Sequence, residues 1–205
     1  MLHILRSPAR TGEDAVLRSM FAARKSVFVD LLKWDVPVIG GRYEIDQFDT
    51  VHATYVVLAD AEGAHLGSAR LLPTVLPHIL DSFYPGLCEN GPPRGPAIQE
   101  VTRFCLDRRL TARRRRAVRD TLVTALAAHA LECGITAYSA IAEAGWLQQI
   151  LAFGWRCRPL GLPREIGGSV LGALRIEISG ETPALLAAAG IAADPALMPS
   201  RCLAA

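Results

Sequence analysis

The chain has 205 residues, of which 51% are hydrophobic and 20% are charged, and its formal net charge at pH 7 is +2. This composition is typical of a folded globular protein with a substantial core, and it excludes an intrinsically disordered chain. The small net charge excludes a protein that binds nucleic acid through its overall charge, so any basic function depends on local clustering. We expect one domain over residues 1–205.

The cysteines and the apolar segments predict a cytoplasmic protein. The five cysteines are odd in number and widely spaced, with no CxxC pair, so we expect neither a disulfide framework nor a metal site. The best transmembrane candidate falls short of about 18 apolar residues because His129 and Glu132 interrupt it, and we expect no membrane partner. The first residues lack the apolar core of a secretion signal and predict a β-strand.

The first half of the chain alternates between helical, irregular and strand patterns. Thr11 is a candidate N-cap for the first helix, and Pro37 with the pair Gly40 and Gly41 favours a loop after it. A turn that contains Gly63 joins two strands of a hairpin. In chain order, we predict a helix over residues 13–32, a loop over 36–48, strands over 52–58 and 65–72, a short helix over 76–82 and a strand over 98–106.

The second half predicts an α/β fold. Thr111 is a candidate cap for a long helix, and Gly134 would end it. Strands that alternate with helices after a hairpin predict a single mixed sheet covered on both faces, which is a three-layer α/β/α sandwich. The predicted elements are helices over residues 111–132, 143–152 and 183–193 and strands over 135–141, 155–160 and 170–178.

Arg24, Phe28 and Trp34 form the first candidate binding group. Positions 24 and 28 share one face of the predicted helix, and Trp34 follows it. A cation beside two aromatic rings can close over a flat, charged ligand such as an adenosyl group. The alternative is structural: the aromatic residues belong to the core, and Arg24 pairs with a surface acid.

Asp46 and Asp49 are three residues apart and flank Phe48. On a turn-like backbone both carboxylates can face one site, where they attract a cation or hold an amine. The alternative is that they make local turns and caps, as aspartates in loops commonly do. The spacing alone favours the second interpretation.

Glu100 and Arg103 form a third candidate group. On a regular strand Glu100 and Thr102 share one face, and Arg103 lies on the other unless a bulge intervenes. A glutamate near an amine can take its proton, and an arginine offers a planar fork to a carboxylate, whereas the alternative is a cross-strand ion pair. Arg70 lies in an apolar strand and requires an acidic partner, for which the candidates are Asp46, Asp49 and Glu100.

The order and spacing of these residues resemble those of the acyl-homoserine lactone synthases of the LuxI type. The resemblance implies a fold similar to the Gcn5-related N-acetyltransferases. It also implies that the amine of S-adenosylmethionine attacks an acyl thioester carried on acyl carrier protein or coenzyme A. The methionyl carboxylate then displaces methylthioadenosine and closes the lactone, a quorum-sensing signal. The eight matching positions are Arg24, Phe28, Trp34, Asp46, Asp49, Arg70, Glu100 and Arg103.

The resemblance also implies roles for individual residues, with S-adenosylmethionine as a substrate and no cofactor. The S-adenosylmethionine site would comprise Arg24, Phe28, Trp34, Asp46, Arg103 and Phe104. The catalytic set would comprise Glu100, Arg103, Asp46, Asp49 and Arg70. Small residues lie on the strand and turn where the family's acyl tunnel would pass, which suggests an acyl pocket at Ser139, Ala140, Ala142 and Trp146; the alternative is that the small residues only permit close helix packing.

Four consecutive arginines open the long predicted helix, where positive charge opposes the helix dipole. One interpretation is a solvated turn with ion pairs. The other is docking of an acidic acyl carrier protein or of the phosphates of coenzyme A at Arg113, Arg114, Arg115 and Arg116. No recognised DNA- or RNA-binding motif accompanies them, so we expect no nucleic-acid partner.

Two other functions compete with the lactone synthase, and the oligomeric state stays open. An N-acyltransferase that uses acyl coenzyme A on another amine would carry the pyrophosphate loop Arg/Gln-x-x-Gly-x-Gly/Ala, which is absent around residues 108–116. A non-catalytic carrier-binding module would keep the basic helix, but it would not require Glu100, Asp46 and Asp49 together. The sequence therefore favours the synthase.

Overall fold

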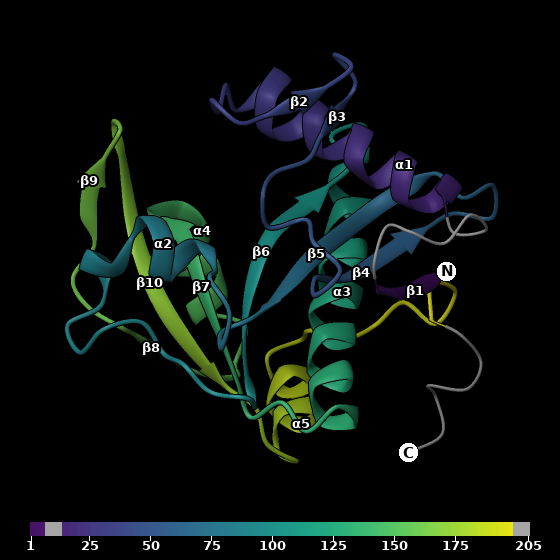
Figure 1. Ribbon diagram of the computed structural model, residues 1–205. Coiled ribbons are helices and arrows are strands. Elements are labelled where there is room, and N and C mark those ends of the chain that lie inside the picture. Colours follow the sequence, from purple (N-terminus) through teal and green to yellow (C-terminus); the bar gives the residue numbers. More distant parts are fainter. Residues whose placement is uncertain (7–13, 199–205) are drawn as a thin grey trace. The chain divides into compact units, whose positions relative to one another are not determined.

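The computed structural model describes residues 1–6 and 14–198 (Figure 1). The candidate cap Thr11 and Cys202 lie outside these residues. The chain divides into two units: the first contains residues 1–70, 103–125 and the segment that begins at Ala192, and the second contains residues 71–102 and 126–191. Three elements have residues in both units: β5 (His65–Pro73), β6 (Ile98–Leu106) and α3 (Ala112–Glu132).

The first unit builds its sheet in the order β1, β4, β5, β6. Strand β1 is antiparallel to β4, with Leu2 opposite Leu58, and every residue of β4 is buried. The elements of the first unit are β1 (Leu2–Arg6), α1 (Asp14–Arg24), a π-helix (Lys25–Leu31), β2 (Val38–Ile39), β3 (Tyr43–Glu44), β4 (Thr54–Ala59) and parts of β5 (His65–Pro73), β6 (Ile98–Leu106) and α3 (Ala112–Glu132).

Helices cover both faces of this sheet. Gly67 lies on the face under α3, where an added Cβ would come 2.8 Å from Val118 Cγ1, so the helix approaches the strand closely because this residue is glycine. Arg70 lies on the opposite face, which α1 covers, and it pairs there with Asp46 and Asp49.

The second unit is built around β6, β7, β10 and β8 in that order, with β9 also paired to β10. Strands β6 and β7 are parallel, and β10 is antiparallel to its three neighbours, so the sheet is mixed. Its further elements are α2 (Ile79–Phe83), a 3-10 turn (Pro85–Leu87), β7 (Ala137–Glu143), α4 (Ala144–Leu151), β8 (Arg156–Pro159), β9 (Arg164–Ile166), β10 (Ser169–Glu177) and α5 (Thr182–Ala188).

Both faces of the second sheet are also covered. Ala173 lies opposite Ile141 in the β10–β7 register, and both pack under Leu80 of α2 and the neighbouring Leu87. Gly172 faces the other side, where an added Cβ would come 2.8 Å from Leu147 Cδ2 of α4. The prediction of a mixed sheet with helices on both faces is confirmed, with β1–β4 antiparallel and β6–β7 parallel.

Local deviations from the predicted elements have clear causes. The predicted loop 36–48 contains the β2–β3 hairpin, because Gly40 and Gly41 adopt the positive φ angles of a tight turn, 58° and 64°. Strand β9 was not predicted, since it is three exposed residues long. The helix predicted over 76–82 begins at Ile79. Within the described residues, no helix is long and apolar enough to cross a membrane.

His65, the first residue of β5, is buried without a full set of hydrogen bonds. Its Nε2 lies 2.9 Å from Ser68 Oγ, and its backbone N–H donates to Ser19 Oγ, whereas Nδ1 has no hydrogen-bond partner among residues 1–6 and 14–198. Burial lowers the pKa of His65 to about 4, with Asp107 opposing the shift and Arg109 adding to it. The imidazole is therefore neutral in the folded protein at neutral pH.

This burial predicts acid sensitivity. In the unfolded chain His65 takes up its proton near pH 6.5. The contribution of the neutral His65 to the free energy of unfolding is therefore fully present above that pH. It is lost as the pH falls toward 4, by up to about 3 kcal/mol. Denaturant titrations of wild type and His65→Gln between pH 7 and pH 4 measure the difference in slope. The exposed His52 provides the control variant His52→Gln, which should keep the wild-type slope. Equal slopes for wild type and His65→Gln would contradict the prediction.

Candidate active site

The helix that begins as α1 widens into a π-helix over Lys25–Leu31, and this change places two aromatic rings together. Trp34 N–H donates to Phe28 O at 2.8 Å, and Lys33 adopts a φ of 61°, so the chain turns back on the helix end. The rings of Phe28 and Trp34 stack at a centroid distance of 4.8 Å and an interplanar angle of 13°. Phe28 is buried, whereas Trp34 is 37% exposed. Single π-helical turns are frequent at functional sites.

Arg103 completes this aromatic group. It adopts a φ of 50° inside β6, which marks the bulge that the strand pattern had left open. Its guanidinium carbon lies 5.6 Å from the Phe28 centroid and 5.9 Å from the Trp34 centroid. A charged group over these rings gains cation–π attraction.

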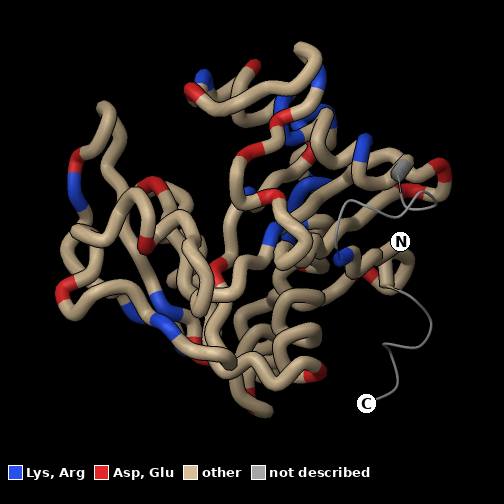
Figure 2. Tube along the Cα trace, in the orientation of Figure 1, with Lys and Arg blue, Asp and Glu red and all other residues tan. Residues whose placement is uncertain are grey.

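Beneath the rings lies a buried group of charges that we call the ionic cluster. Figure 2 shows basic and acidic positions close together around α1 and the segment that follows it. Each of its side chains is at most 10% exposed. The members are Arg24, Arg70, Arg103, Glu44, Asp46 and Asp49.

Asp49 lies at the centre of the cluster, and both of its oxygens are fully used. Oδ1 accepts from Arg24 Nη1 at 2.8 Å and from the Tyr55 hydroxyl at 2.9 Å, and it pairs with Arg70 Nη1 at 2.9 Å. Oδ2 accepts from Arg24 Nη2 at 2.9 Å and from Asp46 N–H at 2.8 Å. Burial alone would raise the pKa of Asp49, but Arg24 and Arg70 hold it well below its usual range.

Asp46 joins two arginines. It accepts from Arg70 Nη1 at 2.6 Å and Nη2 at 3.0 Å, a two-pronged pairing, and from Arg103 Nη2 at 2.7 Å. It also accepts the N–H of Phe48, which is the local turn bond that loop aspartates commonly make. Asp46 therefore does both things that the sequence suggested: it binds cationic groups, and it makes a local turn.

The sequence analysis missed Glu44, a member of the cluster, and Tyr55, whose hydroxyl donates to it. Glu44, at the end of β3, accepts from Arg24 Nε and from Arg103 Nε and Nη2, the latter at 3.1 and 2.9 Å. A signal was present: three buried arginines against two aspartates leave one positive charge unmatched, so a third acid was required. Nothing in the local pattern around Tyr55 marks it.

The cluster is neutral, with three guanidinium groups and three carboxylates. Charges this deeply buried are tolerated only when they are paired and hydrogen-bonded. Arg24 and Arg70 are 1% exposed, whereas Arg103 is 10% exposed. Among the described residues, Nη1 of Arg103 has no hydrogen-bond partner, so this nitrogen can bind an added carboxylate beside the aromatic rings.

Glu100 lies in the second unit and has a different environment. Its Oε2 accepts the N–H of Ile79 at 2.8 Å, and its Oε1 accepts the N–H of Leu80 at 2.9 Å, so the carboxylate anchors the start of α2. The residue is fully buried. These two bonds fix the orientation of the carboxylate.

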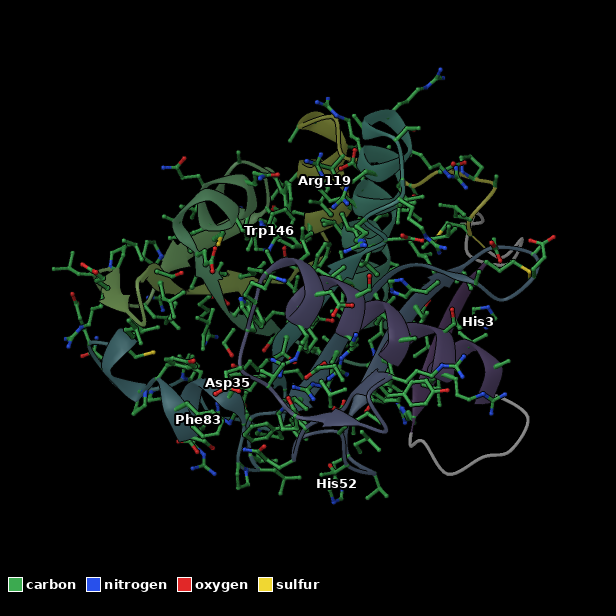
Figure 3. All side chains as sticks on the ribbon, turned by 90° about the horizontal axis from the view of Figure 1, so that it is seen from above. His3, Asp35, His52, Phe83, Arg119 and Trp146 are labelled. Atoms are coloured by element: carbon green, nitrogen blue, oxygen red, sulfur yellow. The ribbon has the colours of Figure 1, made fainter. Side chains whose placement is uncertain are left out.

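The residues predicted for the acyl pocket divide between the two faces of the second sheet. Ser139 is paired with Glu100 in the β6–β7 register and shares its face, and its hydroxyl has no hydrogen-bond partner in the described part of the chain. Ala140 and Ala142 point to the opposite face, which α4 covers. Trp146, labelled in Figure 3, comes from α4 and packs edge-on against Phe153 at 5.7 Å.

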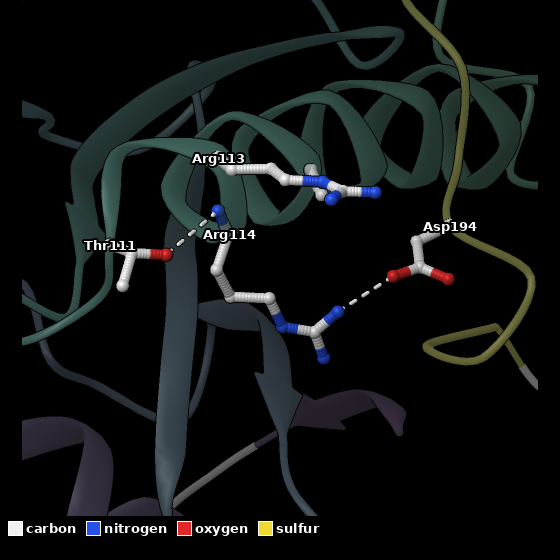
Figure 4. Close-up of a pocket in the computed structure, with 5 residues that line it drawn as sticks. Thr111, Arg113, Arg114 and Asp194 are labelled. Atoms are coloured by element: carbon white, nitrogen blue, oxygen red, sulfur yellow. Dashed lines mark hydrogen bonds and ion pairs between the residues drawn. The ribbon is translucent and has the colours of Figure 1, made fainter.

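The four consecutive arginines open α3 as predicted, and they have unequal partners. Arg114 Nη1 lies 2.7 Å from Asp194 Oδ2 (Figure 4), and Arg115 donates to the carbonyl oxygen of Asp107. Within the part of the chain that the structure describes, Arg113 and Arg116 form no ion pair. Phe104, in β6, is half-buried.

Comparison with known proteins assigns the family. The sequence model of the family described as autoinducer synthase matches residues 9–185. The chain belongs to the autoinducer synthase family. An acyl-homoserine-lactone synthase of Ralstonia nicotianae is 34% identical over 188 residues, which cover 89% of this chain and 92% of that protein. One from Ralstonia solanacearum is 33% identical, with 90% and 91% covered.

Solved structures support the same assignment. A coenzyme A-dependent acyl-homoserine lactone synthase, BjaI, described with S-adenosylmethionine and isopentyl-CoA, has a TM-score of 0.83 and 28% identity, and the match covers 97% of this chain and 92% of that one. Another coenzyme A-dependent member, MesI, has a TM-score of 0.82 and 29% identity, with 95% and 97% covered. A putative N-acetyltransferase of Lactobacillus plantarum, 18% identical with a TM-score of 0.55, shares the fold; its match covers 87% and 99%.

The neutrality of the ionic cluster predicts that Glu44→Gln is strongly destabilising. The amide keeps the shape of the side chain but leaves Arg24 and Arg103 with one carboxylate fewer, and an unmatched buried charge costs about 3 to 5 kcal/mol. Chemical denaturation measures the free energy of unfolding. The control is Asp30→Asn, which breaks the exposed pair with Lys25 and should cost at most about 1 kcal/mol. Similar losses for both variants would contradict the role given to Glu44.

Proposed function

We propose that the chain is an acyl-homoserine-lactone synthase. It transfers an acyl group from a thioester to the amine of S-adenosylmethionine, and then closes the lactone with release of methylthioadenosine. The observation that carries this proposal is the ionic cluster, which uses Arg24, Asp46, Asp49, Arg70 and Arg103 together and leaves Arg103 Nη1 available beside two aromatic rings. The match to BjaI, described with S-adenosylmethionine and an acyl-CoA, supports both substrates.

Within this site some residues contact the substrate, and others, which we call the frame, hold those residues in position. Arg103 binds the methionyl carboxylate through Nη1, and Phe28 and Trp34 pack against the adenosyl and sulfonium groups. Asp49 belongs to the frame, because all of its acceptor positions are used within the protein. Asp46 orients Arg70 and Arg103, and Arg24 holds Asp49. Phe104 lines the same site from β6.

Glu100 is the general base of the first step. The α-amine has a reference pKa of about 7.7 to 8.0, so it is largely protonated near neutral pH and must lose a proton before it attacks. Glu100 takes this proton directly or through one water. The amine nitrogen then bonds to the thioester carbonyl carbon, and the thiol leaves.

The second step requires positioning rather than a base. The methionyl carboxylate oxygen attacks the carbon next to the sulfonium, the carbon–sulfur bond breaks, and methylthioadenosine leaves as a neutral thioether. Because the reacting groups belong to one molecule, their effective concentration is high. Arg103 holds the carboxylate in place for this attack.

The acyl donor is a coenzyme A thioester. Two similar solved structures are described as coenzyme A-dependent, and Arg113 and Arg116, which form no ion pair with the residues that the structure describes, offer positive charge to phosphates. An acyl carrier protein, which is acidic, is the second candidate for the same arginines. The acyl chain packs against Ala140 and Ala142 under α4, with Trp146 nearby. We place the enzyme in the cytoplasm, where both substrates are made, and we assign residues 1–205 to one synthase domain.

The proposed activity has a direct test. Purified protein is incubated with S-adenosylmethionine and a panel of acyl-CoA and acyl carrier protein thioesters, and mass spectrometry detects the products. We expect acyl-homoserine lactone and methylthioadenosine in equal amounts, with acyl-CoA as the better donor. If folded protein yields neither product across the panel, the proposal fails; an N-acylated amine without methylthioadenosine would favour the alternative acyltransferase.

Glu100 requires a test that separates its two roles. Glu100→Gln should lower turnover by at least about 100-fold with little change in S-adenosylmethionine affinity, because the amide cannot accept the proton. Ile79→Pro is the matched variant. It removes one of the backbone N–H groups that donate to Glu100 while leaving the carboxylate in place, and proline suits this first helical position. Single-turnover rates and calorimetric binding measure both effects. A large loss of turnover in Ile79→Pro with full turnover in Glu100→Gln would contradict the assignment of Glu100 as the base.

A further inference from the structure

Ser139, in the middle of β7, carries a buried hydroxyl without a hydrogen bond. The residue is 0% exposed, and its Oγ has no partner within the ranges 1–6 and 14–198. The great majority of buried polar side-chain atoms in proteins are paired, because an unpaired one loses its bonds to water and gains none in return. Such an exception requires an explanation, and a catalytic role is one of the few that the physics allows.

The hydroxyl lies beside the proposed base. Ser139 is paired with Glu100 in the parallel register of β7 and β6. Paired residues on neighbouring strands, whose backbones are about 4.8 Å apart, point to the same face of the sheet. That face is the one that α2 covers (Figure 1), because Ile141, two residues along β7, packs under Leu80, and the Leu80 N–H donates to Glu100.

The charged neighbours of Ser139 are engaged in other hydrogen bonds. On one side, Glu100 accepts two backbone N–H groups at the start of α2, at 2.8 and 2.9 Å. On the other side, Arg175 lies opposite Ser139 in the β10–β7 register, and its Nε donates to Glu177 Oε1 at 2.6 Å. The fold therefore keeps an O–H donor next to Glu100 and leaves it available to a ligand.

The first step of the proposed reaction requires a donor at this place. After Glu100 takes one proton from the ammonium group, the nitrogen bonds to the thioester carbonyl carbon, and the π electrons of the carbonyl move onto its oxygen. When the carbon–sulfur bond breaks, these electrons re-form the carbonyl, and the thiolate leaves with a second proton from the nitrogen. Hydrogen-bond donors aimed at the oxyanion lower the energy of the transition state. Because the amine gives its proton to Glu100, the carbonyl that it attacks also lies beside this residue.

We propose that the Ser139 hydroxyl donates to the thioester carbonyl oxygen and stabilises the oxyanion of the acyl-transfer step. Ser139 is then a catalytic residue that acts together with Glu100 on the neighbouring strand. Its burial serves this role, because a hydrogen bond to a developing charge is stronger where water is excluded. This inference rests on the proposed function, since it assigns a residue to the first step of that reaction.

Ser139→Ala tests the role because it should change activity and stability in different directions. The substitution removes only the hydroxyl, and the single-turnover rate of acyl transfer should fall by about 100-fold, as is usual when one oxyanion donor is lost. Calorimetric binding of S-adenosylmethionine should be unchanged. The midpoint of chemical denaturation should stay the same or rise, because the variant loses a buried group that makes no hydrogen bond.

Ser169→Ala is the matched control. Ser169 belongs to β10 of the same sheet, and its hydroxyl already donates to Glu143 Oε1 at 3.2 Å. This variant loses a hydroxyl of the same kind at a position away from Glu100, and it should keep the wild-type rate of acyl transfer. An equal loss of rate in both variants would overturn the inference.

The choice of acyl donor separates the oxyanion role from recognition of the acyl chain. Every thioester has the reacting carbonyl, so Ser139→Ala should lower the rate equally with an unsubstituted acyl-CoA and with the 3-oxo acyl-CoA of the same length. A loss confined to the 3-oxo donor would assign the hydroxyl to that substituent and overturn the inference. A lower denaturation midpoint with an unchanged rate would also overturn it, because the hydroxyl would then have a structural role.

The outcomes distinguish this inference from the proposed function. If wild type forms the lactone and folded Ser139→Ala forms it at the same rate, the synthase stands and the oxyanion role does not. If wild type forms no lactone from any thioester, the proposed function fails, and the inference fails with it.

Discussion

The ionic cluster is the interaction on which the first unit depends. Its charges come from α1, from β3 and the loop after it, from β5 and from β6, so four separate parts of the chain must be correctly placed before the charges balance. A buried charge without its partner is far more costly than the pair is favourable. The cluster therefore restricts these elements to the one arrangement in which every buried charge is paired. The same arrangement leaves one edge of Arg103 exposed.

Irregular backbone gathers around the same cluster. The π-helix after α1, the positive φ of Lys33 and the positive φ of Arg103 are each unfavourable for an ordinary chain. Together they bring Phe28, Trp34 and the Arg103 guanidinium into contact. Such departures persist when surrounding contacts determine them, and here the buried ion pairs of Arg103 and the stacking of the rings do so.

The two units hold their carboxylates by different means. Asp46 and Asp49 are held by arginines, whereas Glu100 is held by two backbone amides at the start of α2. Amide donors fix the orientation of a carboxylate without adding a full positive charge beside it. Both kinds of donor stabilise the ionised form of the carboxylate.

The sequence by itself determined the order of the longer strands and helices, without the short strands β2, β3 and β9, and the eight hallmark residues, because periodicity, turn residues and motif spacing are local properties of the chain. Tertiary structure alone decided which residues pair. Glu44 meets Arg24 across 20 positions, Asp46 meets Arg103 across 57, and Asp194 meets Arg114 across 80. No local sequence pattern indicates which residues pair across such separations along the chain. The π-helix and the bulge at Arg103 were likewise decided by these long-range contacts, since regular helix and strand would otherwise be favoured there.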